Sequence, residues 1–194
     1  MNQKFEETER NKSTSILKKV ITKHPLTVFF ILSFLLIILF VLIRVILFLF
    51  GYFEVIEFVL QLFTVTTPTF AAIIVSYVLG GWTEVKKTFQ GFTKWKVNWI
   101  WYFFGFLLIL APLLYAIIYN LATNSPLYFA QGYTIPAFII QCIFLLIRGP
   151  LSEEPGWRGF ALPRLESRFT ALTSSIILGL IWAFWHLPMY FVET

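Results

Sequence analysis

Hydrophobic residues are arranged along this chain in long segments that are separated by short polar connections. Most of these segments are close to the roughly 20 residues that an α-helix needs to cross the hydrocarbon core of a bilayer. The pattern therefore predicts an all-α, multi-pass transmembrane helical bundle with about five spans. The spans are expected at residues 26–50, 55–80, 98–120, 134–148 with a continuation beyond, and 171–191.

The composition agrees with a membrane protein. Hydrophobic residues make up 58% of the chain and charged residues 13%, whereas an ordinary globular domain has about 25% charged residues. The polar segment 1–24 is longer than the n-region of a signal peptide, and the apolar run after it is longer than an h-region. This favours a retained span over a cleaved leader. A soluble globular protein is excluded, and membrane lipids are the expected surroundings.

Positive charge alternates between the polar connections. Residues 1–24 and the connection 86–96 are rich in lysine or arginine, whereas the first connection, near Gly51, contains neither and the connection 120–134 has no charged residue. Lysine and arginine accumulate in cytoplasmic segments. We therefore expect the chain in the cell membrane with a cytoplasmic N-terminus. The same topology explains the net charge of +5 without a nucleic-acid partner.

Arg44 lies inside the first predicted span. A charged side chain in this place either lines a cavity or snorkels, which means that its aliphatic stem lies in lipid while its guanidinium reaches the interface. Because Arg44 is close to the end of the span, we interpret it as a snorkelling residue at the outer interface.

The polar residues of the C-terminal half are concentrated in segment 149–168, where the adjacent carboxylates Glu153 and Glu154 are followed by Arg158. Ionisable groups at membrane depth are costly and persist mainly where they pair or serve a function. On a helix, Glu154 and Arg158 stand at positions i and i+4 and can form a pair. Glu153 then points about 100° away, and its poorly solvated carboxylate is available as a proton acceptor.

The last predicted span carries a polar stripe. The members of the stripe fall within an arc of about 60° on a helical wheel, and the small residues among them allow another helix to approach closely. They are Ser175, Gly179, Trp182 and His186. Because most of the remaining span is apolar, the stripe is expected to face the interior of the bundle.

Glu153 and His186 are equally far from an expected turn. The midpoint between them falls at Phe169–Thr170, within the polar segment 164–174. In an antiparallel helix pair that turns there, both residues lie at most roughly 24 Å from the turn, given the helical rise per residue. We therefore expect Glu153 and His186 at matching depth and within water-bridging distance of each other.

The residues by themselves leave two interpretations open. Glu153, Glu154, Arg158 and His186 are the residue types of a hydrolytic site, in which a carboxylate activates water. The same residues can also form an interfacial salt-bridge cluster at the end of the fourth span, with His186 as a polar residue near the outer face. Composition favours neither interpretation over the other.

The spacing of these residues resembles the motifs of a known family. Glu153-Glu154-x-x-x-Arg158 and Trp182-x-x-x-His186 are similar to the EExxxR and aromatic-xxx-His motifs of the CAAX-prenyl endopeptidase and bacteriocin-processing (CPBP) family of intramembrane proteases. The combination of both motifs is specific, whereas either motif alone is not.

The resemblance implies an endopeptidase that hydrolyses peptide bonds of membrane-associated peptides or proteins, with prenylated and bacteriocin-like substrates as two candidates. It implies that Glu153 is the base that activates water and that His186 holds or polarises this water. Glu154 and Arg158 are expected to shape and charge the pocket. The alternative function is a non-catalytic membrane immunity or peptide-binding protein that retains the pocket.

The resemblance also suggests how the chain is divided. We expect a cytoplasmic polar tail at 1–24, accessory transmembrane helices at 25–120 and a partial protease core at 134–194. Family members usually carry a further motif, a second histidine followed four residues later by asparagine or a similar residue, which binds the oxyanion. The other histidine of this chain is His24, so the chain is expected to be a C-terminally truncated member.

The metal requirement is a separate question. Catalytic zinc normally takes three protein ligands and leaves one position open. The candidate ligands in this chain are Glu153, Glu154 and His186. Because family members are often labelled metalloproteases, zinc is one expectation, and a metal-free mechanism with a carboxylate base is an equal one.

Overall fold

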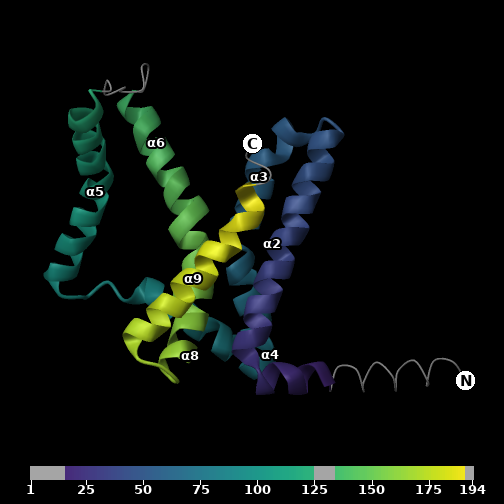
Figure 1. The fold of residues 1–194 in the computed structure, drawn as a ribbon. Helices are drawn as coiled ribbons and strands as arrows, with labels where there is room; N and C mark the ends of the chain where they lie inside the picture. The colour runs from purple at the N-terminus through teal and green to yellow at the C-terminus, as the bar shows by residue number, and fades with distance from the viewer. Residues whose placement is uncertain (1–15, 125–133, 191–194) are drawn as a thin grey trace, which may run out of the picture. The chain divides into compact units, whose positions relative to one another are not determined.

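The computed structural model describes residues 16–124 and 134–190, and the regular structure in these ranges is helical (Figure 1). The all-α class predicted from the sequence is therefore confirmed. The elements are α2 (Pro25–Leu49), α3 (Phe53–Val65), α4 (Thr67–Thr88), η1 (Gln90–Thr93), α5 (Trp99–Thr123), α6 (Ile135–Leu146), η2 (Ile147–Leu151), α7 (Ser152–Glu154), η3 (Pro155–Ala161), α8 (Leu162–Glu166) and α9 (Ala171–Tyr190).

The described residues provide three helices that are long and apolar enough to cross a membrane, namely α2, α5 and α9. A fourth span results if α3 and α4, which meet at a bend of 51°, count as one. The sequence predicted about five spans, and the difference lies at 134–148. There α6 has 12 residues, fewer than the about 20 that a crossing needs. Pro150, which lacks a backbone N–H, follows closely and disturbs the α-helical pattern.

The contacts divide the chain into two compact units, one of residues 1–91 and 144–194 and the other of residues 92–143. The second unit contains α5 and most of α6. The side chain of Asn98 caps the start of α5 by accepting a hydrogen bond from the N–H of Ile100 at 3.1 Å. The division into tail, accessory helices and protease core at residue 134 stays a prediction.

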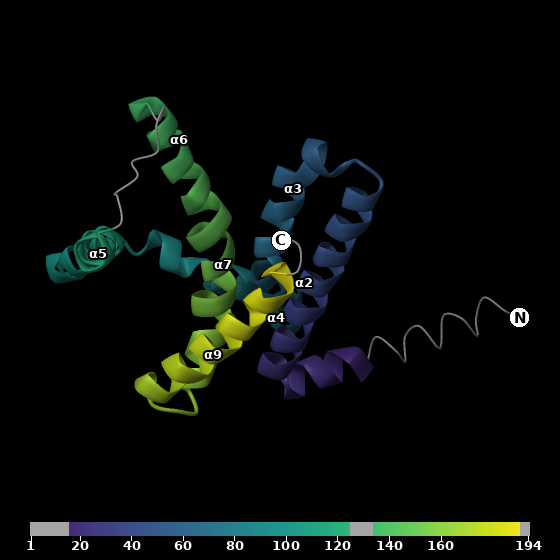
Figure 2. The ribbon, with the colours of Figure 1, turned by 45° about the horizontal axis from the view of Figure 1, so that its top comes forward.

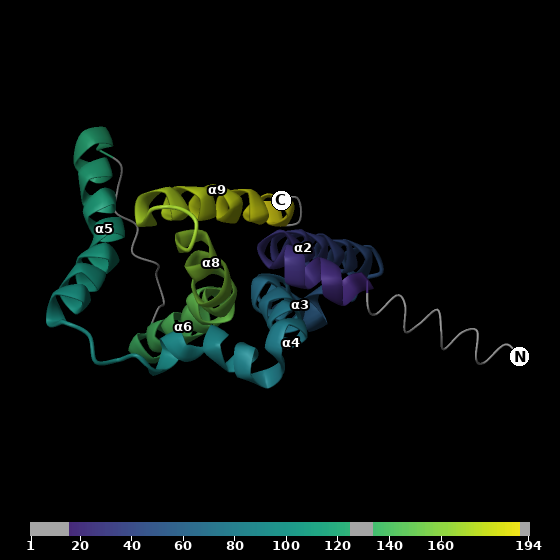
Figure 3. The ribbon, with the colours of Figure 1, turned by 90° about the horizontal axis from the view of Figure 1, so that it is seen from below.

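The first unit is built around an aromatic cluster. Phe29 of α2, Trp157 and Phe160 of η3, and Trp185 of α9 are all fully buried. The ring centroids of Phe29 and Phe160 are 4.9 Å apart, and those of Trp157 and Trp185 are 5.7 Å apart. Figures 1 and 2 show α9 beside α2, and Figure 3 shows α2 and α8 between α9 and α4. The cluster therefore fixes η3 between α2 and α9.

Helix α4 is interrupted in its second half. Gly80 and Gly81 have non-helical backbone angles, and Gly81 has a φ of 62°, which glycine adopts without steric cost. The chain bends there, and the hydroxyls of Ser76 and Thr88 lie 3.1 Å apart. This hydrogen bond joins the two halves of α4.

Two glycines bring η3 against the backbone of α4. A Cβ atom on Gly156 would lie 2.5 Å from the carbonyl carbon of Pro68, and a Cβ atom on Gly159 would lie 1.9 Å from the carbonyl oxygen of Thr88. Both distances are too short for a real contact. Glycine is therefore needed at both positions for this packing, which holds the segment after the Glu153–Glu154 pair in place.

Arg44 does not reach the surface. It is 1% exposed, and its Nε donates a hydrogen bond to Oε2 of Glu57 at 3.2 Å, while its Nη2 forms an ion pair with the same carboxylate. The snorkelling interpretation is therefore wrong. Glu57 lies on α3, which packs against α2, so the guanidinium finds its counter-charge inside the protein.

Candidate active site

Glu153 and Glu154 lie on α7, which is a single α-helical turn between the π-helical segments η2 and η3. Pro150 lies in η2 and Pro155 begins η3. Neither proline has a backbone N–H to continue an α-helical ladder. Local π-helical geometry often marks functional sites, and here it sets the directions of the two carboxylates.

Thr69 of α4 anchors the backbone of α7. Its hydroxyl donates a hydrogen bond to the carbonyl oxygen of Ser152 at 2.6 Å, and this contact is buried. Ser152 directly precedes Glu153. A contact between residues 83 positions apart leaves no local signal, and sequence reasoning missed Thr69 for that reason.

The Glu153 side chain is buried and hydrogen-bonded to α9. It is 7% exposed, and its Oε2 accepts a hydrogen bond from Nε1 of Trp182 at 2.7 Å. Burial disfavours an ionised carboxylate, whereas a donated hydrogen bond stabilises it. The sequence predicted that Glu153 faces a different partner from that of Glu154. This partner is Trp182, the aromatic residue of the second motif. The motif alone did not reveal this contact.

Glu154 is held by Arg158, as the i, i+4 spacing predicted. Nη1 of Arg158 donates to Oε1 of Glu154 at 2.8 Å, and both side chains are partly exposed. The guanidinium carbon lies 5.5 Å from the ring centroid of Trp182, within the range of a cation–π contact. Arg158 therefore connects one carboxylate of the pair to the aromatic ring that holds the other.

The ring of His186 has a defined orientation. Its Nδ1 lies 2.8 Å from the carbonyl oxygen of Trp182. Because a carbonyl oxygen only accepts hydrogen bonds, Nδ1 carries the proton in this contact, and in the neutral ring Nε2 is then the acceptor nitrogen. The ring centroid lies 4.9 Å from that of Trp182 and 4.8 Å from that of Trp185. The imidazole is thus packed and oriented.

Trp182 links the two motifs in space. It binds Glu153 through its indole N–H and His186 through its carbonyl oxygen. The turn expected at Phe169–Thr170 is present, because α8 ends at Glu166 and α9 begins at Ala171. The turn lets α9 return towards α7, where Trp182 of the second motif contacts Glu153 of the first. The separation of the Glu153 and His186 side chains stays a prediction.

The candidate metal ligands do not form a metal site. In the part of the chain that the structure describes, no three histidine, cysteine or acidic side chains are grouped so as to hold a metal ion. Glu154 is engaged by Arg158, and one oxygen of Glu153 is engaged by Trp182. Because catalytic zinc takes three protein ligands, these residues do not fit a zinc centre, and we derive no step that uses a metal.

Comparison with known proteins supports the family resemblance of the C-terminal segment. Residues 135–194 match the model of a family described as Type II CAAX prenyl endopeptidase Rce1-like. The chain is also 34% identical over 91 residues to CAAX prenyl protease 2 of Methanococcus maripaludis. Both matches support the resemblance to the CPBP family. The similarity to the archaeal protease covers 45% of this chain and 34% of that protein, so the chain matches about a third of the length of this relative.

Both CPBP motifs lie inside the matched segment, and so do all four candidate site residues. The comparison with solved structures gave no significant match. The match to a CAAX prenyl endopeptidase family and the helices α2, α5 and α9, which are long and apolar enough to span a bilayer, together indicate a membrane protein.

Proposed function

We propose that this protein is an intramembrane endopeptidase. It hydrolyses peptide bonds of membrane-associated peptides or proteins, prenylated or bacteriocin-like, by means of a water molecule activated by Glu153 and His186. The observation that carries the proposal is the buried Glu153 carboxylate, held at 2.7 Å by Trp182. His186 follows on the same helix about one turn later, with Nε2 as its acceptor nitrogen.

The catalytic water has two acceptors. Oε2 of Glu153 is occupied by Trp182, so Oε1 takes one proton of the water while Nε2 of His186 accepts the other O–H. The water oxygen attacks the carbonyl carbon of the substrate, and negative charge develops on the carbonyl oxygen. Glu153 then returns its proton to the amide nitrogen, the C–N bond breaks, and a carboxyl and an amine end are released.

Glu154 and Arg158 have a supporting role. Their ion pair keeps the second carboxylate away from the catalytic water and adds a positive group beside Trp182. An arginine paired with a carboxylate also stabilises its ionised form. The pair thus shapes and charges the pocket while Glu153 carries out the proton transfer.

The test is cleavage of lipid-anchored peptides, prenylated and unprenylated, by the protein in liposomes. The Glu153→Gln variant is expected to lose turnover, because an amide does not accept the proton of water, and the near-isosteric change lets the helices insert. Glu166→Gln, at an exposed carboxylate of α8, is the matched control and retains activity. If the protein binds the peptides without cleaving them, the endopeptidase proposal is wrong and the non-catalytic alternative replaces it.

The proposal includes a topology with a cytoplasmic N-terminus. It is supported by the lysines at 18, 19 and 23 and by those in segment 86–96, and by the absence of charge from 120–134. Residues 1–15 and 125–133 of these segments lie outside the described residues. In a Cys142→Ser background, Lys87→Cys is expected to react with a membrane-impermeant thiol reagent only after the cells are opened. Labelling in intact cells would overturn this orientation.

A further inference from the structure

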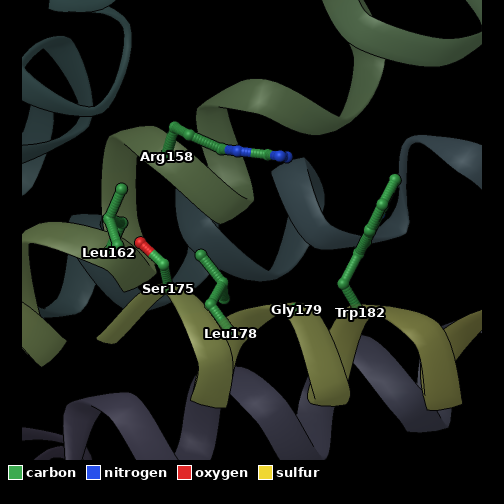
Figure 4. A pocket seen from close by; sticks show the side chains of 6 residues that line it. All are labelled: Arg158, Leu162, Ser175, Leu178, Gly179 and Trp182. Carbon is green, nitrogen blue, oxygen red and sulfur yellow. The ribbon is translucent and has the colours of Figure 1, made fainter. Parts of the chain in front are cut away.

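A polar pocket lies apart from the candidate active site, where η3 and α8 pack against the last turn of α4 and η1. Its volume is about 320 Å³. The pocket drawn in Figure 4 is a different one, because it is lined by Arg158 and Trp182 and so belongs to the candidate active site. The lining of the larger pocket includes none of the four candidate site residues. All of its lining residues belong to the first unit of the chain.

The close approach of η3 to α4 fixes one wall of this pocket. Gly159 and Thr88 both line it, and a Cβ atom on Gly159 would lie 1.9 Å from the carbonyl oxygen of Thr88. The Thr88 side chain is buried, and its hydroxyl lies 3.1 Å from that of Ser76. The wall is therefore made of tightly packed backbone, which keeps the cavity in shape.

The guanidinium of Arg164, another lining residue, has a fixed orientation. Its Nη1 donates a hydrogen bond to the carbonyl oxygen of Phe160 at 2.9 Å, and its central carbon lies 3.7 Å from the Phe160 ring centroid. Within residues 16–124 and 134–190, no carboxylate forms an ion pair with Arg164. A guanidinium has five N–H donors in a planar fork that matches phosphate. Arg164 is therefore oriented and has donors left for an anion.

The charges that line the pocket leave one positive charge in excess. Lys87 and Arg164 are cationic, and Glu84 is the carboxylate among the lining residues. Glu84 forms an ion pair with Lys87 and also attracts Arg164. An ammonium group has three donors, so Lys87 keeps donors beyond the one that Glu84 engages. The excess matches the single negative charge of a phosphodiester.

The pocket lies at the depth expected for lipid head groups. Arg164 begins the polar segment 164–174, which leads into α9, a helix long enough to span a bilayer. Lys86 and Lys87 occupy the last turn of α4, and Trp82 of the same helix is 65% exposed. Lysine and tryptophan accumulate at the membrane–water boundary, and basic pockets between helices at this boundary bind anionic head groups.

We propose that this pocket binds the head group of an anionic glycerophospholipid with a single phosphodiester, and that Arg164 and Lys87 hold its phosphate. The volume of about 320 Å³ exceeds the roughly 150 Å³ of a cavity that accommodates benzene. A phosphate and part of the head-group alcohol therefore fit. The lipid reaches the pocket from the bilayer, and its site uses none of the residues assigned to catalysis.

The experiment measures lipid binding to the purified full chain in an uncharged detergent by native mass spectrometry. Phosphatidylglycerol, phosphatidylethanolamine and inorganic phosphate are the probes. Phosphatidylglycerol is expected to bind at least about fivefold more tightly than phosphatidylethanolamine, because the latter has no net charge to offset the excess positive charge. Inorganic phosphate at the same concentration is expected not to displace phosphatidylglycerol, because apolar contacts of the acyl chains also hold the lipid.

Two pairs of variants compare a cation of the pocket with a neighbouring cation outside it. Arg164→Gln is expected to weaken phosphatidylglycerol binding about tenfold or more, since it removes charge-assisted hydrogen bonds to the phosphate. Arg168→Gln, at an exposed arginine of the same polar segment, should leave the affinity nearly unchanged. Lys87→Gln is expected to weaken binding about fivefold, whereas Lys86→Gln, at an exposed lysine that does not line the pocket, should not.

A third variant is expected to act in the opposite direction. Glu84→Gln removes the carboxylate from the pocket and releases Lys87 from its ion pair, so phosphatidylglycerol is expected to bind about two- to fivefold more tightly. If Glu84 only stabilised this part of the fold, the same change would weaken binding or leave it unaltered.

Each contrary outcome overturns a defined part of the proposal. Equal losses in Arg164→Gln and Arg168→Gln, or equal affinities for the two lipids, would show general charge attraction instead of a head-group site. Displacement by inorganic phosphate at the same concentration would show a site for soluble phosphate. If Arg164→Gln fails to fold, the Lys87→Gln and Lys86→Gln pair and Glu84→Gln decide, and equal affinities among them refute the site. Because the readout is lipid binding, none of these outcomes depends on peptidase activity.

Discussion

The hydrogen bond from Trp182 to Glu153 is open to a conservative test. Trp182→Phe keeps an aromatic ring and the backbone carbonyl that orients His186, but it removes the N–H that lies 2.7 Å from Oε2 of Glu153. A hydrogen bond to a charged group contributes about 1.5–3 kcal/mol. Since about 1.4 kcal/mol corresponds to a factor of ten in rate, we expect kcat to fall about 10- to 100-fold.

The assay is cleavage of a lipid-anchored peptide in liposomes, with kcat and KM measured separately. Because the lost contact positions the base, the reduction is expected in kcat, with KM nearly unchanged. Trp185→Phe is the matched control: Trp185 is also buried, and its indole N–H has no hydrogen-bond partner among the described residues. If Trp182→Phe loses no more kcat than Trp185→Phe, or loses affinity only, the hydrogen bond does not position Glu153.

Two further predictions concern the packing that holds this segment. Thr69→Val removes the donor to the α7 backbone carbonyl and should lower the free energy of unfolding by about 1–3 kcal/mol. Thr22→Val, at an exposed threonine, should change it by less than about 0.5 kcal/mol. Gly159→Ala places a Cβ atom against the carbonyl oxygen of Thr88 in α4 and should lower the free energy of unfolding by about 1–3 kcal/mol. Gly149→Ala should leave this free energy nearly unchanged, because a Cβ atom at Gly149 has open space around it. Denaturant unfolding in detergent checks both, and equal stabilities within either pair would contradict the packing described.

Local sequence spacing predicted the parts of the site that depend on one helix or one turn. The Glu154–Arg158 pair follows from i, i+4 geometry, and the turn at Phe169–Thr170 follows from a polar segment between two apolar ones. In these cases the interacting groups are near in sequence, so the helical repeat fixes their relative positions.

Contacts between distant segments could not be predicted in this way. Thr69 supports α7 from 83 residues away, and the partner of Arg44 depends on how α2 packs against α3. The tendency of an indole N–H to find an acceptor was the available signal for Trp182, but it does not name the acceptor. The structure also has fewer candidate spans than the sequence predicted, because the apolar run at 134–148 does not indicate where α6 ends.

The proposed catalytic site requires that Glu153 and His186 lie within reach of one water molecule. In a Cys142→Ser background, the pair Glu153→Cys and His186→Cys can be treated in membranes with a short thiol-specific cross-linker. Glu166→Cys with His186→Cys serves as the control. A base reaches its proton directly or through one water, so rapid cross-linking of the first pair and not of the second is the expected result. Absence of cross-linking in the first pair, or a structure with the Glu153 and His186 side chains more than about 10 Å apart, would contradict a shared catalytic site.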